Sequence, residues 1–208
     1  RAHQDGRVRM LLGDVRDSQR LARSLAGVGV VIHSAALKRA DAIEYNALEA
    51  VHTNITGSEN VVNAAIDAKV AHAVLVSSDK AVRPSNIYGA TKMIAEQLFL
   101  RPYTGVAGPT FSVCRFGNFL GSRGSVVPMW QRELKDHGSI SLTDPRMTRY
   151  VVTLREAASF VLHTIEHGKG GLHIPEMRTL HMRDLAAVVA GVAPVRRVGP
   201  RVGEKLHA

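Results

Sequence analysis

The residues from Ala73 to Lys92, AVLVSSDKAVRPSNIYGATK, decide the predicted fold. The apolar run 73–76 is rich in β-branched residues, which predicts a buried strand. Polar residues and Pro84 follow it, and a helix is predicted from about Tyr88 to Leu100. A buried strand, a turn and a helix in succession form the unit from which parallel sheets wound by helices are built.

The same alternation extends in both directions from this stretch. Further strands are expected at 8–12, 28–32, 110–113, 139–142 and 172–174, and further helices at 18–26, 47–68, 129–136, 154–167 and 182–190. We therefore predict an α/β fold with a Rossmann-type parallel sheet wound by helices. Residues 1–118 would form an incomplete dinucleotide-binding domain, and residues 119–208 mostly a smaller substrate-binding portion that interleaves with the sheet.

The motif that normally opens a dinucleotide-binding sheet is missing. It consists of a strand, a G-x-G-x-x-G turn and a helix. The closest match, Gly27-Val28-Gly29, precedes a predicted strand and has Ile32 at the third glycine position. We expect that the first βα unit or units are lacking, so that the chain is truncated at its N-terminus. Without them we also expect poor NADP binding and little activity, because the pyrophosphate would lose its helix N-terminus.

Composition excludes several classes of protein. The net charge is +9 over 208 residues, but the basic residues are dispersed, so an anionic small molecule is expected as partner rather than nucleic acid. One cysteine, Cys114, excludes an intrachain disulfide. No apolar run approaches the ~20 residues of a membrane helix, and a cytoplasmic location is expected. His163 to His167 match H-x-x-E-H, but no third ligand is evident and no metal is expected.

Tyr88 and Lys92 are four residues apart on the predicted helix, so they share one face of it. An ammonium close to a phenol favours the phenolate, and we expect Lys92 to lower the pKa of Tyr88 in this way. A phenolate can take the proton of a sugar hydroxyl while hydride leaves the same carbon. The spacing alone is common in proteins, but its position after a strand and a turn favours a functional role.

Asp79 and Lys80 follow the predicted strand at 73–76. Side chains at the carboxyl end of such a strand point into the ligand crevice of an open α/β sheet. An acid and a base side by side suit an elimination, in which the base removes a carbon-bound proton and the acid protonates the leaving hydroxyl.

Taken together, these residues resemble the inverting UDP-N-acetylglucosamine 4,6-dehydratases, in the polysaccharide-biosynthesis branch of the extended short-chain dehydrogenases. The resemblance covers nearly the whole chain. It is carried by VSSDKA at 76–81 and PSNIYGATK at 84–92, and by GDVRD at 13–17, HSAALK at 33–38, TNITG at 53–57, RFGN at 115–118, GSRGSVVP at 121–128, TDPRMTR at 143–149 and GEKLH at 203–207.

The resemblance implies a reaction. Tyr88 would be the base for oxidation at C4 of the sugar, and Lys92 would orient the nicotinamide ribose. The cofactor would be NADP, or alternatively NAD, and would take the hydride from C4. Lys80 would then remove the C5 proton, and Asp79 would protonate the departing C6 hydroxyl. Return of the hydride to C6 and reprotonation of C5 from the other face would invert that centre.

The resemblance also implies binding residues. Asp14 and Val15 would flank the adenine, and Lys38 would lie near both cofactor and sugar. The rest of the dinucleotide would be lined by Ser34, Ala35, Ala36, Asn54 and Ser77, together with Tyr88 and Lys92. The UDP-sugar would be held by Ser78, Asn118, Ser122, Arg123, Gly124, Arg149, Arg201 and Glu204, of which the arginines suit a diphosphate.

Two alternatives stay open at this point. One is a related enzyme, a UDP-sugar 4-epimerase or a C5-retaining dehydratase, which would use Tyr88 and Lys92. An epimerase would not need Asp79 and Lys80. The other is a non-catalytic nucleotide-binding fragment, against which the intact set of four residues argues. A homo-oligomer is expected for the full-length protein by analogy only.

Overall fold

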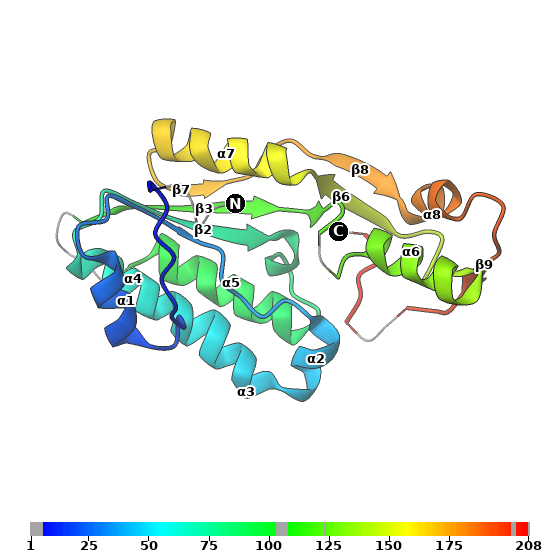
Figure 1. The fold of residues 1–208 in the computed structure, drawn as a ribbon, viewed down its shortest axis with the longest axis horizontal. Coiled ribbons are helices and arrows are strands. Elements are labelled where there is room, and N and C mark those ends of the chain that lie inside the picture. The colour runs from blue at the N-terminus through cyan, green and yellow to red at the C-terminus, as the bar shows by residue number, and fades with distance from the viewer. Residues whose placement is uncertain (1–5, 103–107, 123, 201–202, 208) are drawn as a thin grey trace.

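The computed structural model describes residues 6–102, 108–122, 124–200 and 203–207 of the chain. Its largest sheet has the strand order β1-β2-β3-β7, and every neighbouring pair is parallel. The bounds of these strands are β1 Val30–His33, β2 His72–Ser78, β3 Thr110–Phe116 and β7 Gly171–His173. Figure 1 shows helices below this sheet and α7 above it, which confirms the predicted parallel sheet wound by helices.

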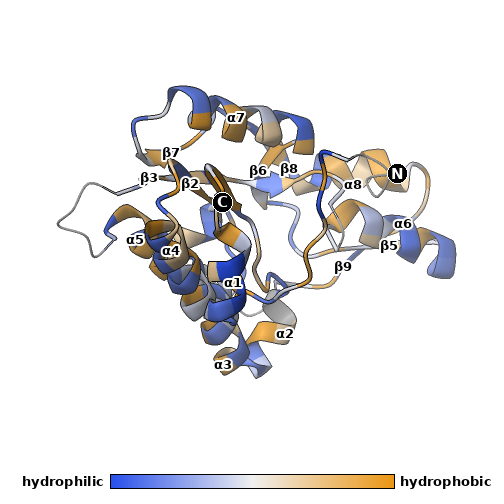
Figure 2. Ribbon diagram, turned by 60° about the vertical axis from the view of Figure 1, so that its left-hand side comes forward, coloured by the Kyte–Doolittle hydropathy of each residue, from blue (hydrophilic) through white to orange (hydrophobic). Residues whose placement is uncertain are grey.

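Helices α1 (Ser18–Leu25), α4 (Gly57–Asp67) and α5 (Ile87–Leu100), on the lower face, share one apolar cluster with the strands. Val31, Leu75 and Val113 of the sheet pack there with Ala65 and Phe99 of the helices. The bounds of the other helices on this side are α2 Ala40–Tyr45, α3 Ala47–Ala50 and η2 Val51–Thr56. Helix α7 (Leu154–His167) packs its Ala157 and Val161 on the opposite face. In Figure 2 the strands β2 and β3 are coloured mostly hydrophobic, whereas α7 carries both colours.

The second half of the chain forms two smaller sheets beside the carboxyl ends of the main strands (Figure 1). One has the order β4-β6-β8, and the other pairs β5 with β9. The core of this part surrounds the buried indole of Trp130, with Ile140 and Ala186. The bounds are β4 Asn118–Phe119, β5 Ile140–Leu142, β6 Thr148–Val152, β8 Arg178–His181, β9 Val195–Arg197, α6 Val126–His137 and α8 Met182–Ala190.

The strand predicted at 8–12 is wrong. These residues are extended but form no ladder with any described strand, and Met10, Leu11 and Leu12 are exposed. A β-strand needs a neighbouring strand to exchange backbone hydrogen bonds with, and an apolar run in the sequence does not show whether such a neighbour exists. Residues 47–67 are helical throughout, as predicted for 47–68. The stretch is α-helical at both ends and π-helical in the middle, at η2.

One face of the sheet is only partly covered. Along β1, the side chains of Val31 and His33 are buried on the helix-covered side, while those of Val30 and Ile32 are exposed on the other. An apolar groove of about 340 Å³ runs from Ile32 to Leu162 of α7. Among the helices formed by the described residues, none is both long and apolar enough to cross a bilayer.

Candidate active site

Asp79 and Lys80 lie directly after strand β2, where the chain enters the short 3₁₀ helix η3 (Asp79–Ala81). Ser78 caps this helix, and its hydroxyl oxygen accepts a hydrogen bond from the Lys80 amide at 3.3 Å. The carboxyl ends of parallel strands border the ligand crevice of an open α/β sheet. The predicted acid and base therefore lie together at the edge of the sheet where ligands bind in such folds.

The Lys80 ammonium is held between two side-chain oxygens. Its Nζ donates to Oδ1 of Asp79 at 3.0 Å and to Oδ1 of Asn118 at 3.0 Å. Asn118 is the first residue of β4 and follows the end of β3 by two residues. The Lys80 ammonium is therefore held by one residue after β2 and one residue after β3. The second carboxylate oxygen of Asp79, Oδ2, is buried and has no hydrogen-bond partner in the described part of the chain. Leaving such an acceptor unpaired costs free energy, which a ligand hydroxyl at this position would recover.

Helix α5 brings Tyr88 to this pair. Asn86 caps the helix, and its side-chain oxygen accepts from the Gly89 amide at 2.8 Å. A Cβ at position 89 would collide with the backbone oxygen of Lys80, so only glycine lets α5 and η3 approach this closely. The start of α5 therefore lies against the backbone that carries Asp79 and Lys80.

The expectation that Lys92 lowers the pKa of Tyr88 is wrong for this structure. Burial of the phenol raises the pKa of Tyr88 to about 12; a hydrogen bond with Ser78 opposes this rise and the charge of Asp79 adds to it. The Lys92 ammonium donates a hydrogen bond to the carbonyl oxygen of Val76 at 2.9 Å, so one of its three N–H groups points at strand β2. Burial also lowers the pKa of Lys92 to about 8. The phenol is therefore neutral at pH 7 and needs more positive charge beside it to ionise.

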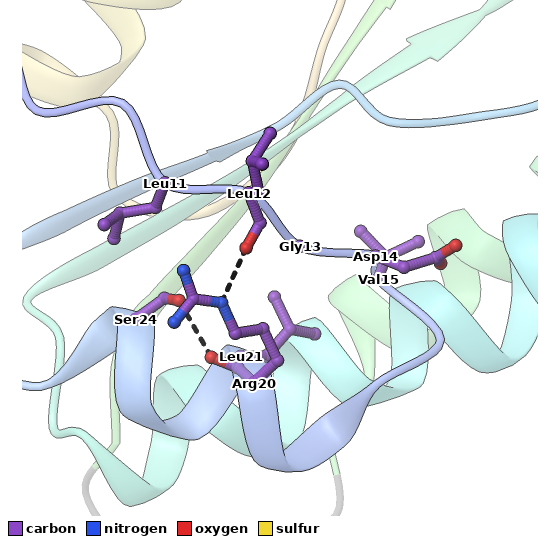
Figure 3. Close-up of a pocket in the computed structure, with 8 residues that line it drawn as sticks. All are labelled: Leu11, Leu12, Gly13, Asp14, Val15, Arg20, Leu21 and Ser24. Atoms are coloured by element: carbon purple, nitrogen blue, oxygen red, sulfur yellow. Dashed lines mark hydrogen bonds between the residues drawn. The ribbon is translucent and has the colours of Figure 1, made fainter.

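Asp14 and Val15 border a pocket of about 210 Å³ between the extended N-terminal segment and α1 (Figure 3). Arg20 closes one side, and its Nε donates to the carbonyl oxygen of Leu12 at 2.7 Å. Hydrogen bonds from Arg16 lower the pKa of Asp14 to about 2. The walls of the pocket are thus largely apolar, which suits the flat ring of a nucleobase, while both carboxylate oxygens of Asp14 are hydrogen-bonded to Arg16.

The loop 34–36 follows β1 at the same edge of the sheet. Asn54 fastens the end of this loop: its Oδ1 accepts from the Leu37 amide at 2.8 Å, and its Nδ2 donates to the Leu37 carbonyl at 2.9 Å. The same Nδ2 donates to the hydroxyl of Thr91 on α5 at 3.0 Å. Asn54 therefore holds the predicted cofactor loop against the helix that carries Tyr88.

Two other predicted cofactor residues differ in their surroundings. Lys38 is exposed beyond the loop. Ser77 is buried, and its hydroxyl donates to Glu96 of α5 at 2.6 Å. Ser77 is thus hydrogen-bonded inside the protein, whereas Lys38 is exposed to solvent.

Most of the residues predicted to hold the substrate come from the second half of the chain; Lys38 and Ser78 are the exceptions. Arg149 of β6 is buried, and its Nη1 donates to the carbonyl oxygens of Thr148 and Leu206. Burial lowers the pKa of Arg149, while the charges of Glu204 and Asp79 oppose this change. Arg149 therefore lies close enough to Glu204 and to Asp79 to interact electrostatically with both. Ser122 and Gly124 lie in the turn before α6, and Arg123 and Arg201 lie outside the described residues.

Sequence reasoning missed the buried carboxylate of Glu96. It lies one helical turn after Lys92 and accepts hydrogen bonds from Arg115 of β3. The spacing of four residues from Lys92 was the available signal, because residues i and i+4 share a helix face. In the described ranges no group of three or more His, Cys, Asp or Glu side chains could hold a metal ion.

The chain is similar to known proteins over nearly its whole length. The sequence profile described as polysaccharide biosynthesis protein matches residues 2–208. The UDP-N-acetylglucosamine 4,6-dehydratase (inverting) of Campylobacter jejuni is 40% identical over 205 residues, which cover 96% of this chain and 61% of that protein. An uncharacterized membrane protein of Methanocaldococcus jannaschii is 41% identical, with 97% of this chain and 65% of that protein covered. The UDP-glucose 4-epimerase of Rickettsia canadensis is 34% identical, with 96% and 60% covered.

The chain spans 60–65% of the length of these curated relatives. Solved structures agree with the fold. The X-ray structure of Pen from Bacillus thuringiensis matches with a TM-score of 0.93 at 37% identity, covering 98% of this chain and 65% of that one. DesIV, a dTDP-glucose 4,6-dehydratase from Streptomyces venezuelae with NAD and TYD bound, matches with a TM-score of 0.87 at 25% identity, covering 98% and 70%. The predicted Rossmann-type fold is confirmed.

Proposed function

The chain belongs to the polysaccharide biosynthesis protein family, and we propose that it catalyses the NADP-dependent 4,6-dehydration of UDP-N-acetylglucosamine, with inversion at C5. The product would be a UDP-4-keto-6-deoxy sugar for surface-glycan synthesis. One observation carries this proposal: the ion pair of Asp79 and Lys80 lies at the end of β2, against the start of the helix that bears Tyr88 and Lys92. Hydride-transfer and elimination chemistry would then share one site.

Residues of helix α5 would carry out the oxidation half of the reaction. Tyr88 would accept the proton of the C4 hydroxyl as hydride leaves C4. A phenol whose pKa is about 12 does this poorly at neutral pH. The charge of Lys92, and that of the oxidised nicotinamide ring, would favour the phenolate once the ligands are in place. The resulting ketone at C4 acidifies the proton on C5.

Residues of the 3₁₀ helix η3 would carry out the elimination half. Lys80 needs a free electron pair to remove the C5 proton, and Asp79 needs a proton to donate to the C6 hydroxyl, which leaves as water. The ion pair becomes this neutral pair when one proton moves along the hydrogen bond of 3.0 Å from Lys80 to Asp79. The buried Oδ2 of Asp79, which has no partner in the described chain, is the oxygen that can face the leaving hydroxyl.

The described residues fit a dinucleotide at both of its ends. The pocket beside Asp14 and Val15 has apolar walls that suit a nucleobase, and the buried ammonium of Lys92 would lie at the ribose end, near Tyr88. Bound NADP would supply the hydride acceptor for C4 and the hydride donor for C6, so that no external reductant would be consumed. The loop 34–36, held by Asn54, would lie along the molecule between these ends.

The substrate would lie across the edge formed by the second half of the chain. Asn118 would face the sugar, because its amide already holds Lys80. Arg149 would approach the diphosphate together with Arg123 and Arg201 of the sequence, since guanidinium groups pair with phosphate oxygens in a fork geometry. Lys38, Ser78, Ser122, Gly124 and Glu204 complete the proposed contacts.

A 4-epimerase is the second candidate, because one family of relatives carries that name. Incubation of the full-length protein with UDP-N-acetylglucosamine and NADP in D₂O separates the two. We expect a 4-keto-6-deoxy product that carries deuterium at C5 and has the inverted configuration there, as read by NMR. A product that keeps its C6 hydroxyl and differs only at C4 would establish the epimerase. Unchanged substrate, with nucleotide binding intact, would support a non-catalytic module.

A further inference from the structure

Glu96 carries a buried negative charge that the proposed reaction does not use. Its side chain is on α5, one helical turn after Lys92, and is 1% exposed. Three donors hold it: the Ser77 hydroxyl at 2.6 Å, and Nε and Nη2 of Arg115 at 3.0 Å and 2.5 Å. The carboxylate therefore links α5 to strands β2 and β3 beneath the site.

The charges around Lys92 are unbalanced without this carboxylate. The Lys92 side chain is 4% exposed, and burial disfavours its charged form. Glu96 acts in the opposite direction and favours the ammonium. Arg115 is a second cation beside Glu96. The substitution Glu96→Gln removes the negative charge, so the cations of Lys92 and Arg115 would both lose the carboxylate that stabilises them.

Other titratable groups also face Lys92. His33 of β1 feels its charge, which helps to keep the imidazole neutral. Tyr88 precedes it on α5, and Asp79 and Lys80 belong to η3, which packs on that helix. Among the side chains that the structure describes, the other acidic and histidine groups on α2, α3, η2 and α4 are exposed: Glu44, Glu49, His52, Glu59 and Asp67.

We propose that Glu96 is a positioning residue that keeps Lys92 protonated beside Tyr88, and that Arg115 sets how much of the Glu96 charge Lys92 feels. This inference rests on the proposed function only in giving Lys92 a role in hydride transfer. The geometry supports it because the pair of Glu96 and Arg115 is bidentate and anchored on two strands, which fixes the carboxylate one turn from the ammonium.

The test is a direct titration of Lys92 by NMR, in protein whose lysines carry ¹³C at Cε. Lys92→Arg identifies the signal by removing it. We expect Glu96→Gln to move the Lys92 midpoint down by about one pH unit, because a buried cation loses its anion. Arg115→Met should move the midpoint up, because Glu96 then acts on Lys92 without a competing cation. Glu133→Gln is the matched control, since Glu133 is hydrogen-bonded to Ser141 in the second half of the chain.

The opposite signs separate this proposal from a structural role. Both variants break the same ion pair, so damage to the fold would move the two midpoints in one direction, and that result would overturn the proposal. Unchanged midpoints in both variants would also overturn it. If Glu96→Gln fails to fold, Arg115→Met alone still decides, by the sign of its shift. The titration needs no substrate, so an inactive protein with the expected shifts would contradict the proposed reaction and leave the role of Glu96 supported.

In active protein the same signs should appear in the rate. The fall of kcat/KM at high pH follows the loss of the Lys92 proton, so it should begin at lower pH in Glu96→Gln and at higher pH in Arg115→Met. KM for the UDP-sugar should change little, because neither side chain faces the proposed substrate edge. A fall in rate that is equal at every pH would point to a structural effect.

Discussion

The imidazole of His33 shows how burial governs a single side chain in this fold. It is buried in β1, lies 3.0 Å from the Ser58 hydroxyl and stacks on the ring of Phe99. Desolvation is the main cause that lowers its pKa to about 4, and the charge of Lys92 adds to the effect. The folded protein therefore binds a proton at His33 less readily than the unfolded chain does.

A pH dependence of stability follows from this residue. As the pH falls through the unfolded value of 6.5 toward 4, the unfolded chain takes up the proton first, so stability is lost in that window. Between pH 7 and pH 5 we expect His33 to account for a loss of about 2 kcal/mol. Urea unfolding at both pH values, for the protein and for His33→Gln, measures this loss. The variant should lose about 2 kcal/mol less, and an equal loss in both proteins would contradict the account.

At the residue scale, the sequence predicted which side chains meet but not how they ionise. Asp79, Lys80 and Tyr88 come together because a strand, a turn and a helix are consecutive in the chain. The pKa of Tyr88 was mispredicted because burial and the charge of Asp79 raise it, and burial depends on contacts from the whole fold. Glu96 was missed for the same reason, since its partner Arg115 is on another strand.

At the element scale, the contact between α5 and η3 sets the distance between the two halves of the proposed chemistry. Gly89→Ala should push the helix away from the Lys80 backbone. We expect dehydration to fall by at least tenfold, as a misplacement of about 1 Å costs up to 100-fold, while nucleotide binding at the pocket beside Asp14 changes little. Steady-state kinetics with a nucleotide-binding assay checks this.

Gly29→Ala is the matched control for that substitution, because nothing lies within 4 Å of a Cβ at position 29. It should leave the rate unchanged. A Gly89→Ala protein with ordinary turnover would show that the close approach of α5 and η3 is not needed.

Elements whose pattern is local were predicted well. Helix α7 begins and ends as expected, because the capping box of Thr153 and Glu156 and the helix end at Gly168 are written in the sequence. Strands β6 and β8 were not predicted, since they pair with each other across distant parts of the chain. The segment 8–12 failed in the opposite way, having the pattern of a strand without a partner among the described residues.

At the scale of the whole molecule, the sheet brings the residues of the proposed oxidation and elimination together along one edge. Asp79, Lys80 and Asn118 follow the carboxyl ends of β2 and β3, and Tyr88 and Lys92 belong to α5. Helix α5 lies below the sheet in Figure 1. The second half of the chain reaches the same edge through Arg149. The parallel fold was predictable from alternating strands and helices, whereas the meeting of the two halves depends on pairing that no local pattern encodes.

The central claim is that oxidation and elimination belong to different residues of one site, and a single-turnover experiment with Lys80→Ala in the full-length protein tests it most directly. With UDP-N-acetylglucosamine and bound NADP, we expect the absorbance of the reduced cofactor to appear and persist, because Tyr88 can still act at C4. Water loss and deuterium uptake at C5 should fall by about 1,000-fold. Tyr88→Phe should abolish both signals. Dehydrated product formed at the ordinary rate by Lys80→Ala would contradict the account.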